Sequence, residues 1–104
     1  MNRVTIELWL WLGKELKGEF QTPSEMRAIK EVHVEEGTTI RDLLDNLAKH
    51  YSPIARAVFD RQEKRVYRHV VVNYNDQVTN PHNVHEKVLK DGDKITIFPI
   101  YTGG

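Results

Sequence analysis

The residues with the clearest chemical potential are the two glycines that end the sequence, Gly103 and Gly104. A C-terminal carboxylate is ionised at neutral pH, and its carbonyl carbon is then a poor electrophile. Another enzyme must attach a leaving group before this carbon can react. Because glycine has no Cβ, a Gly-Gly end passes along a narrow channel and leaves its carbonyl accessible. The pair alone is a weak signal, but it marks the carboxylate of Gly104 as a candidate reactive group.

A flexible tail over residues 100–104 would carry these glycines. Pro99 cannot donate a backbone hydrogen bond, so we expect it to end sheet pairing and direct the tail outward. Five extended residues span about 17 Å at roughly 3.3 to 3.6 Å per residue. We expect Pro99, Ile100, Tyr101 and Thr102 to contact a partner. The alternative is that the glycines are only a frayed terminus or a cloning remnant.

Other residue types offer little chemistry. The absence of cysteine excludes disulfides, thiolate metal sites and a thiol nucleophile. His82 and His85 have no further spaced pair of ligands, so we interpret them as part of a polar loop and expect no metal. Asp42 and Asp45 are interpreted as solvated charges on a helix. No catalytic triad, phosphate-binding glycine loop or paired catalytic carboxylates are present, so the chain is expected to supply no catalytic side chain.

Composition limits the classes of partner. The 104 residues include 15 basic and 15 acidic side chains, so no general positive field favours nucleic acid or an anionic membrane. The most apolar stretch, Val4 to Leu12, is too short and too interrupted to cross a bilayer. We therefore expect one domain over residues 1–104, a cytoplasmic location, and neither nucleic-acid nor membrane partners.

Periodicity predicts the elements that must position the tail. Alternation over Val4 to Leu12 predicts a strand that ends at Gly13. A loop or hairpin insertion follows over residues 14–27, and a second strand is predicted over Ala28 to Val34. Thr39 and Asp42 resemble a capping box at the start of a helix. The helix carries a single apolar stripe that consists of Ile40, Leu43, Leu44, Leu47, Ala48 and Tyr51.

The second half of the chain continues this order. Ser52 and Pro53 should stop the helix. The charged segment from Asp60 to Arg65 predicts a turn between two short strands, and Val70 to Val72 predicts the centre of a longer strand. Turn residues follow at Asn73, Asn75 and Asp76, and Val84, Val88 and Leu89 suggest a short helical turn. Lys90 to Asp93 is a strong turn signal before a last strand over Lys94 to Phe98.

This order predicts an α+β β-grasp fold, with a mixed sheet of four to five strands and one main helix on one face. The other sheet face would be open to solvent or to a partner. Trp9 and Trp11 should lie on that open face, as should Phe98, and aromatic residues of this kind anchor protein interfaces. The alternative is that the insertion over residues 14–27 folds over these aromatics as a second small core.

The sequence resembles the MoaD/ThiS family of ubiquitin-like sulfur carriers. Three features carry the resemblance: the acidic-glycine turn Asp91-Gly92-Asp93 before the last strand, Pro99 just after it, and the final Gly103-Gly104. The likeness covers Gly37 to Gly104 and the first strand by position. The Asp60 to Arg68 segment resembles the longer MoaD-like branch, which includes the small subunit of molybdopterin synthase.

The resemblance implies a cycle of acyl activation. An E1-like enzyme of the MoeB/ThiF type would adenylate Gly104 with ATP, and a sulfur donor would convert the adenylate to a thiocarboxylate. The carrier itself would bind no cofactor. The implied sulfur acceptor is an enzyme such as the large subunit of molybdopterin synthase, in molybdenum or tungsten cofactor synthesis.

Three alternatives remain open. The chain could be a ubiquitin-like modifier joined to target lysines through Gly104, because both roles use the same activated acyl group. It could carry sulfur for thiamine, cysteine or tRNA thiolation instead. It could also be a β-grasp binding module without covalent chemistry, in which case Gly103 and Gly104 would be dispensable.

Overall fold

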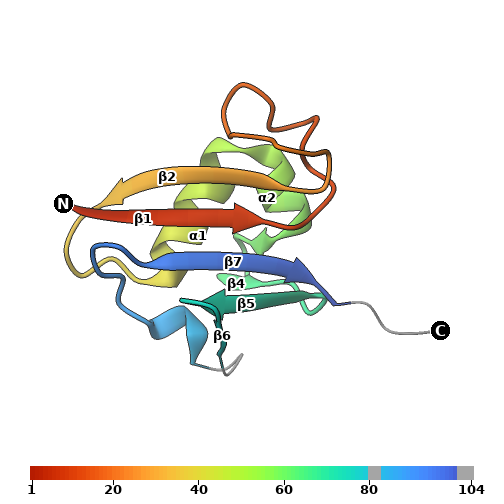
Figure 1. Cartoon of the computed structure of the whole chain (residues 1–104). Helices are drawn as coiled ribbons and strands as arrows, with labels where there is room; N and C mark the ends of the chain where they lie inside the picture. The colour runs from red at the N-terminus through yellow and green to blue at the C-terminus, as the bar shows by residue number, and fades with distance from the viewer. Residues whose placement is uncertain (80–82, 101–104) are drawn as a thin grey trace.

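A computed structural model describes residues 1–79 and 83–100 and confirms the predicted β-grasp fold (Figure 1). Its main sheet has five strands in the order β2-β1-β7-β5-β6. The strands β1 and β7 are parallel neighbours, and every other pair is antiparallel. The bounds of these strands are Asn2–Leu8 (β1), Ala28–Val34 (β2), Val70–Tyr74 (β5), Gln77–Val78 (β6) and Lys94–Pro99 (β7).

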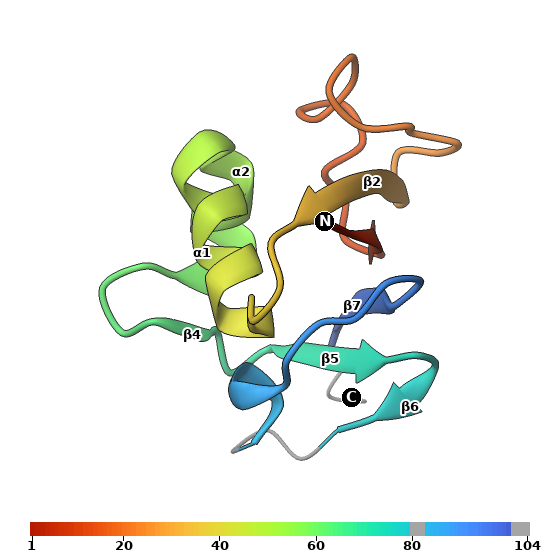
Figure 2. The same cartoon turned by 90° about the vertical axis from the view of Figure 1, so that its left-hand side faces the viewer.

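Two helices cover one face of this sheet and leave the other face uncovered (Figure 2). The main helix α1 spans Ile40–His50, and the predicted capping box is confirmed. Thr39 Oγ1 accepts from the backbone N–H of Asp42, while an Asp42 carboxylate oxygen accepts from the N–H of Thr39. No helix in the described ranges is long and apolar enough to cross a membrane.

The main helix ends before Ser52 and Pro53, as predicted, but a second helix that the sequence did not predict follows it. A second helix, α2, spans Ser52–Ala57 with Pro53 in its first turn. Proline is tolerated there because the first N–H groups of a helix have no partner within the helix. Ile54 and Val58 are fully buried, so α2 closes one end of the core.

The core lies between the helices and the sheet. The inward-facing side chains of β1 and β7 are completely buried, and the apolar stripe of α1 packs against them. These strand residues are Val4, Ile6, Leu8, Ile95 and Ile97. Alternation and helical periodicity predicted this core correctly, because each period places its apolar residues on one face.

The first strand is shorter than predicted. It ends at Leu8, and the chain then makes a tight bend in which the Leu12 N–H donates to the Leu10 carbonyl. Leu10 and Leu12 remain buried although they lie outside the sheet. Gly13 fits a close backbone approach, since a Cβ at this position would lie 2.6 Å from the carbonyl oxygen of Ser24.

The insertion over residues 14–27 lies beside β2 (Figures 1 and 2). Gln21 and Ile29 exchange two backbone hydrogen bonds of 2.8 Å, which cover part of the outer edge of β2. Leu16 and Phe20 are buried in the main core, and the Phe20 ring meets Tyr51 edge to face at 5.3 Å. The insertion therefore extends the helix-side core.

The remaining elements follow the predicted order with one addition. The charged segment forms a turn between β3 (Phe59–Asp60) and β4 (Arg65–Val66), as predicted. Asn73 and Tyr74 belong to β5, so the prediction that Asn73 is a turn residue is wrong, and the turn over Asn75 and Asp76 leads into β6, which the sequence did not predict. Both turn residues have positive φ, which Asn and Asp tolerate better than most residues. A 3-10 helix, η1, spans Val84–Glu86.

Candidate functional site

The acidic-glycine turn fixes the start of β7, the strand that leads to the tail. Asp93 is buried, and its carboxylate accepts from the Tyr74 hydroxyl, the Asn75 amide and the Lys90 N–H. Burial acts to raise the pKa of Asp93, but these donors outweigh burial and lower it. Burial and the hydrogen bond to Asp93 raise the pKa of Tyr74 to about 12. Gly92, at φ +88°, supplies the left-handed residue of the turn.

The far end of β7 is paired further than predicted. Pro99 is part of the strand opposite Val70, and the Ile100 N–H donates to the His69 carbonyl at 2.7 Å. The expectation that Pro99 ends sheet pairing is therefore wrong. Proline does not disturb the pairing with β5, because N–H groups of alternate β7 residues face each neighbouring strand and the N–H that proline lacks would point away from β5.

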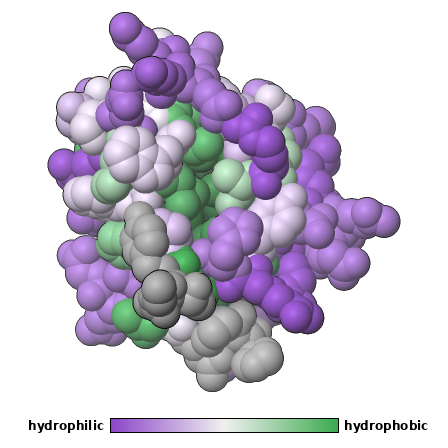
Figure 3. All heavy atoms as spheres, turned by 90° about the vertical axis from the view of Figure 1, so that its right-hand side faces the viewer, coloured by the Kyte–Doolittle hydropathy of each residue, from purple (hydrophilic) through white to green (hydrophobic). Residues whose placement is uncertain are grey.

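The described part of the tail ends at Ile100, whose side chain is 44% exposed. The predictions for Tyr101, Thr102, Gly103 and Gly104 lie outside the described residues. Because β1 and β7 are parallel, both end on the same side of the molecule (Figure 1). On that side, hydrophobic atoms gather in a central hollow between hydrophilic ones (Figure 3).

Trp9 and Phe98 form an aromatic pair on the uncovered sheet face. Their ring centroids are 6.2 Å apart with an interplanar angle of 17°, and both side chains are half-buried. The backbone contributes to this arrangement, since the Trp9 N–H donates to the Ile97 carbonyl at 2.8 Å. Trp11 lies beyond the bend that follows β1 and is 66% exposed. The structure thus unites two of the three predicted aromatics and places the third on the adjoining loop.

A partly buried ion pair between Arg27 and Glu7 lies beside the aromatic pair. The Arg27 guanidinium lies 5.0 Å from the centroid of the Trp9 ring, and its Nε lies 2.6 Å from a carboxylate oxygen of Glu7. The Glu7 side chain is only 5% exposed, and Lys94 Nζ lies 3.6 Å from its other oxygen. Sequence reasoning missed this group, although Glu7 shares the uncovered face with Trp9 by alternation.

Polar side chains continue across the middle of the same face. Thr96 lies opposite Glu7 on one side and opposite Asn73 on the other. Among the described residues, the buried atoms Thr96 Oγ1 and Asn73 Oδ1 have no hydrogen-bond partner. The uncovered face therefore combines an aromatic end near the tail with a polar middle.

The insertion does not cover the aromatic residues, so the alternative of a second small core over them is wrong. Its buried side chains, Leu16 and Phe20, join the helix-side core. Arg27, at the end of the insertion, contacts the Trp9 ring. Trp9 and Phe98 remain partly exposed, and Trp11, on the loop after β1, is exposed.

His85 is not part of a polar loop, which corrects the sequence interpretation. It is buried, and its Nε2 accepts from the Val66 N–H at 3.1 Å. Burial lowers the pKa of His85, and the nearby charges of Arg41 and Arg65 lower it further. His82 lies outside the described residues. Within residues 1–79 and 83–100, no group of three or more His, Asp or Glu side chains is placed to hold a metal ion.

The two helix aspartates have structural partners. Asp42 caps α1, and Asp45 pairs with Arg61 at 3.1 Å and with Lys64 at 3.0 Å. Burial acts to raise the pKa of Asp45, but the hydrogen bonds from Lys64 and Arg61 outweigh it and lower this pKa. These contacts tie α1 to the β3–β4 turn.

Solved structures with the same fold span nearly the whole chain. Small archaeal modifier protein 1 of Haloferax volcanii is 19% identical with a TM-score of 0.71, over 97% of this chain and 100% of that one. A putative molybdopterin converting factor, subunit 1, from Pyrococcus furiosus is also 19% identical, with a TM-score of 0.66 over the same shares. A chain of the Amycolatopsis orientalis BexX/CysO complex is 25% identical, with a TM-score of 0.64 over 97% of this chain and 99% of that one.

No curated protein sequence matches the chain significantly. The family comparison gives a match: residues 20–104 fit the ThiS family, and this range contains the insertion's end, both helices, the turn before β7 and the final glycines. The chain therefore belongs to the ThiS family, the ubiquitin-like sulfur carriers of the ThiS and MoaD type.

Proposed function

We propose that this chain carries sulfur as a thiocarboxylate at Gly104. In the first step, an oxygen of the carboxylate attacks the α-phosphate of ATP on an E1-like enzyme, and pyrophosphate leaves. Hydrosulfide supplied by a donor then attacks the acyl carbon, and AMP leaves with the original oxygen. One oxygen of the carboxylate is thereby replaced by sulfur, while ATP is bound and consumed by the partner.

The family match over residues 20–104 is the observation that carries this proposal. The described geometry supports it. The Asp93 cluster fixes one end of β7, and strand pairing holds the other end as far as Ile100. A rigid strand that leads into the final residues presents them in a defined direction, which favours insertion into a partner's active site.

We further propose that the activating enzyme docks on the uncovered face around Trp9 and Phe98. Trp11, Pro99 and Ile100 adjoin this pair and would contact partners as the tail is taken up, together with Tyr101 and Thr102. Aromatic anchors surrounded by polar groups are typical of protein interfaces that must form and separate. An enzyme of the MoeB/ThiF type fits this role.

For the sulfur acceptor, we propose an enzyme such as the large subunit of molybdopterin synthase. Two observations favour it. The fold is similar to that of the putative molybdopterin converting factor subunit from Pyrococcus furiosus. The β3–β4 hairpin is the segment on which the resemblance to the longer MoaD-like branch depends. The acceptor is tested by mixing the thiocarboxylated chain with that subunit and measuring dithiolene formation on a precursor pterin.

A second candidate function is protein modification through Gly104. It is favoured by the similarity to small archaeal modifier protein 1 of Haloferax volcanii over 97% of this chain. Thiolation for cysteine synthesis is a further variant, supported by the likeness to a chain of the BexX/CysO complex.

One experiment separates the two functions. The chain and a variant that lacks Gly103 and Gly104 are expressed in the source cells and recovered under denaturing conditions. A carrier is recovered as the free chain with a C-terminal thiocarboxylate. A modifier is recovered joined to lysines of other proteins, and the deletion abolishes both products.

A further inference from the structure

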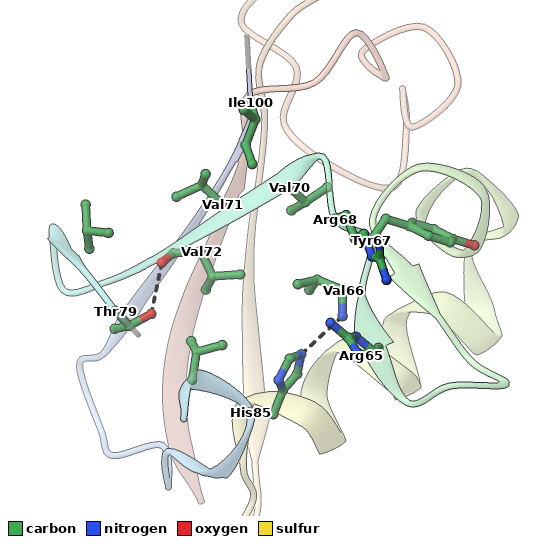
Figure 4. Close-up of a pocket in the computed structure, with 12 residues that line it drawn as sticks. Arg65, Val66, Tyr67, Arg68, Val70, Val71, Val72, Thr79, His85 and Ile100 are labelled. Atoms are coloured by element: carbon green, nitrogen blue, oxygen red, sulfur yellow. Dashed lines mark hydrogen bonds between the residues drawn. The ribbon is translucent and has the colours of Figure 1, made fainter. Parts of the chain in front are cut away.

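A pocket separate from the aromatic pair lies at the β5 edge of the sheet (Figure 4). It has a volume of about 300 Å³ and is enclosed by β5, the end of the β3–β4 hairpin, η1 and the segment after β6. Half of the residues that line it are valines: Val66, Val70, Val71, Val72, Val78 and Val84. This volume is at the lower limit of sites that bind small ligands or single side chains.

Hydrogen bonds hold the walls of this pocket in place. His85 Nε2 accepts from the Val66 N–H at 3.1 Å, and Thr79 Oγ1 donates to the Val72 carbonyl at 3.0 Å (Figure 4). The Tyr67 hydroxyl donates to the Ala55 carbonyl at 2.6 Å. The pocket is therefore largely preformed, and an occupant would lose little free energy in ordering it.

The rim of the pocket is positively charged. Arg65 and Arg68 both line it, and both are exposed. Within residues 1–79 and 83–100, neither arginine forms an ion pair, whereas five other arginines do. Asp60 and Glu63 lie along an adjoining surface depression with the two arginines, but they form no ion pair with them. A guanidinium is suited to a carboxylate, with which it can form two parallel hydrogen bonds.

We infer that this pocket binds an extended acidic segment of a partner protein, with an aliphatic side chain among the valines and an adjacent Asp or Glu carboxylate on Arg65 and Arg68. The apolar wall excludes a fully polar ligand, and the arginine rim selects negative charge.

The surface beyond the pocket favours a protein segment over a free small acid. Val78, 77% exposed, and Ile100, 44% exposed, both contribute to the lining and continue the apolar surface outward. A small acid would fill the pocket and leave these side chains in water, whereas a peptide chain would cover them. Because Ile100 is also the last described residue before the tail, a partner that receives the tail would pass this pocket. The inference does not depend on the chemistry at Gly104.

The test is an NMR titration of the full chain with labelled valine methyl groups. The probe is the blocked peptide acetyl-Val-Leu-Asp-amide, and the matched probe is acetyl-Val-Leu-Asn-amide, which lacks only the charge. We expect saturable shifts at the methyl groups of Val66, Val70, Val72 and Val84. The Asn peptide should bind at least about tenfold more weakly, because it lacks the charge that strengthens hydrogen bonds from the two arginines.

Two variants test whether Arg65 and Arg68 bind the carboxylate of the Asp peptide. The double substitution R65E/R68E should abolish the difference between the two peptides, and K17E, on the exposed insertion at the opposite edge, should preserve it. Circular dichroism checks that each variant is folded. Equal binding of both peptides by the wild-type chain, an undiminished preference for the Asp peptide in R65E/R68E, or unmoved valine methyls would each overturn the inference. Tighter binding of 4-methylpentanoate than of the Asp peptide would overturn its assignment to a protein partner.

Discussion

The Trp9 and Phe98 rings stack on the sheet face that the helices leave uncovered, with centroids 6.2 Å apart. Phe98 lies on β7, Trp9 directly follows the parallel neighbour β1, and Phe98 precedes the last described residue, Ile100, by only two positions. A partner that docks on this pair is therefore already positioned at the base of the tail. This relationship connects the sheet to the proposed activation of Gly104.

Replacing either ring should weaken activation. We expect Trp9→Ala or Phe98→Ala to lower kcat/KM for adenylation by the cognate E1-like enzyme at least about tenfold, as for an aromatic residue at the centre of an interface. Pyrophosphate release measures the reaction. Val88→Ala, a substitution at a 46% exposed valine on another part of the surface, serves as the matched control. Normal kcat/KM in both folded aromatic variants would exclude docking on this face.

The partly buried ion pair between Arg27 and Glu7 should stabilise the folded chain. Arg27→Ala leaves Glu7 buried with only Lys94 nearby, so we expect the free energy of unfolding to fall by about 1 to 3 kcal/mol. Urea denaturation measures the change. Lys14→Ala, which breaks an exposed pair with Glu25, should cost less than about 1 kcal/mol. An equal loss in the free energy of unfolding in both variants would show that the burial of Glu7 does not add to the stability of this ion pair.

Loss of the capping box of α1 should have a smaller and more local effect on stability. Thr39→Ala removes the acceptor for the Asp42 N–H, and N-cap substitutions of this kind cost about 1 kcal/mol of stability. Thr38→Ala, one residue earlier and outside the cap, should cost clearly less in the same urea experiment. If Thr38→Ala proved the more harmful substitution, the role of Thr39 in starting α1 would be refuted.

His85 should make stability depend on pH near neutrality. Its pKa is lowered in the folded state, so the unfolded chain binds the proton more readily. The contribution of neutral His85 to the stability of the fold is complete above the pKa of about 6.5 that histidine has in the unfolded chain. It is lost as the pH falls toward the lower pKa of His85 in the folded chain. The lowered pKa values of Asp45 and Asp93 make stability depend on pH only at more acidic pH. Tm should fall between about pH 7.5 and pH 5.5.

The variant His85→Gln retains an acceptor for the Val66 N–H but cannot titrate. We expect its Tm to change less than that of the wild-type chain over the same pH interval. His33→Gln, at an exposed position on β2, is the control and should retain the wild-type change. An identical pH dependence in the wild-type and His85→Gln chains would contradict a buried neutral imidazole.

Much of the fold could be predicted because local patterns and tertiary packing agree. The alternation around Ile6, the stripe around Leu44 and the cap at Thr39 each specify an element that the core then needs. Prediction failed where tertiary contacts override local signals. Leu12 continues the alternation, yet its chain segment leaves the sheet, and Pro99 joins β7 because the N–H that it lacks would not face β5.

The candidate site was predictable only in part. Alternation placed Trp9 and Phe98 on one face, and the stack confirms that they lie together. It could not predict Arg27 over Trp9, because this contact depends on how a 19-residue connection returns to β2. His85 sits in a polar sequence context, and only the packing of η1 against β4 shows that it is buried.

The central claim is tested most directly by the mass of the chain after incubation with its E1-like enzyme, ATP and a sulfur donor. The account predicts that one oxygen is replaced by one sulfur, that the change maps to Gly104, and that omitting ATP or deleting Gly103 and Gly104 prevents it. An unchanged mass in the complete reaction, with an enzyme shown to activate its own known carrier, would contradict the account.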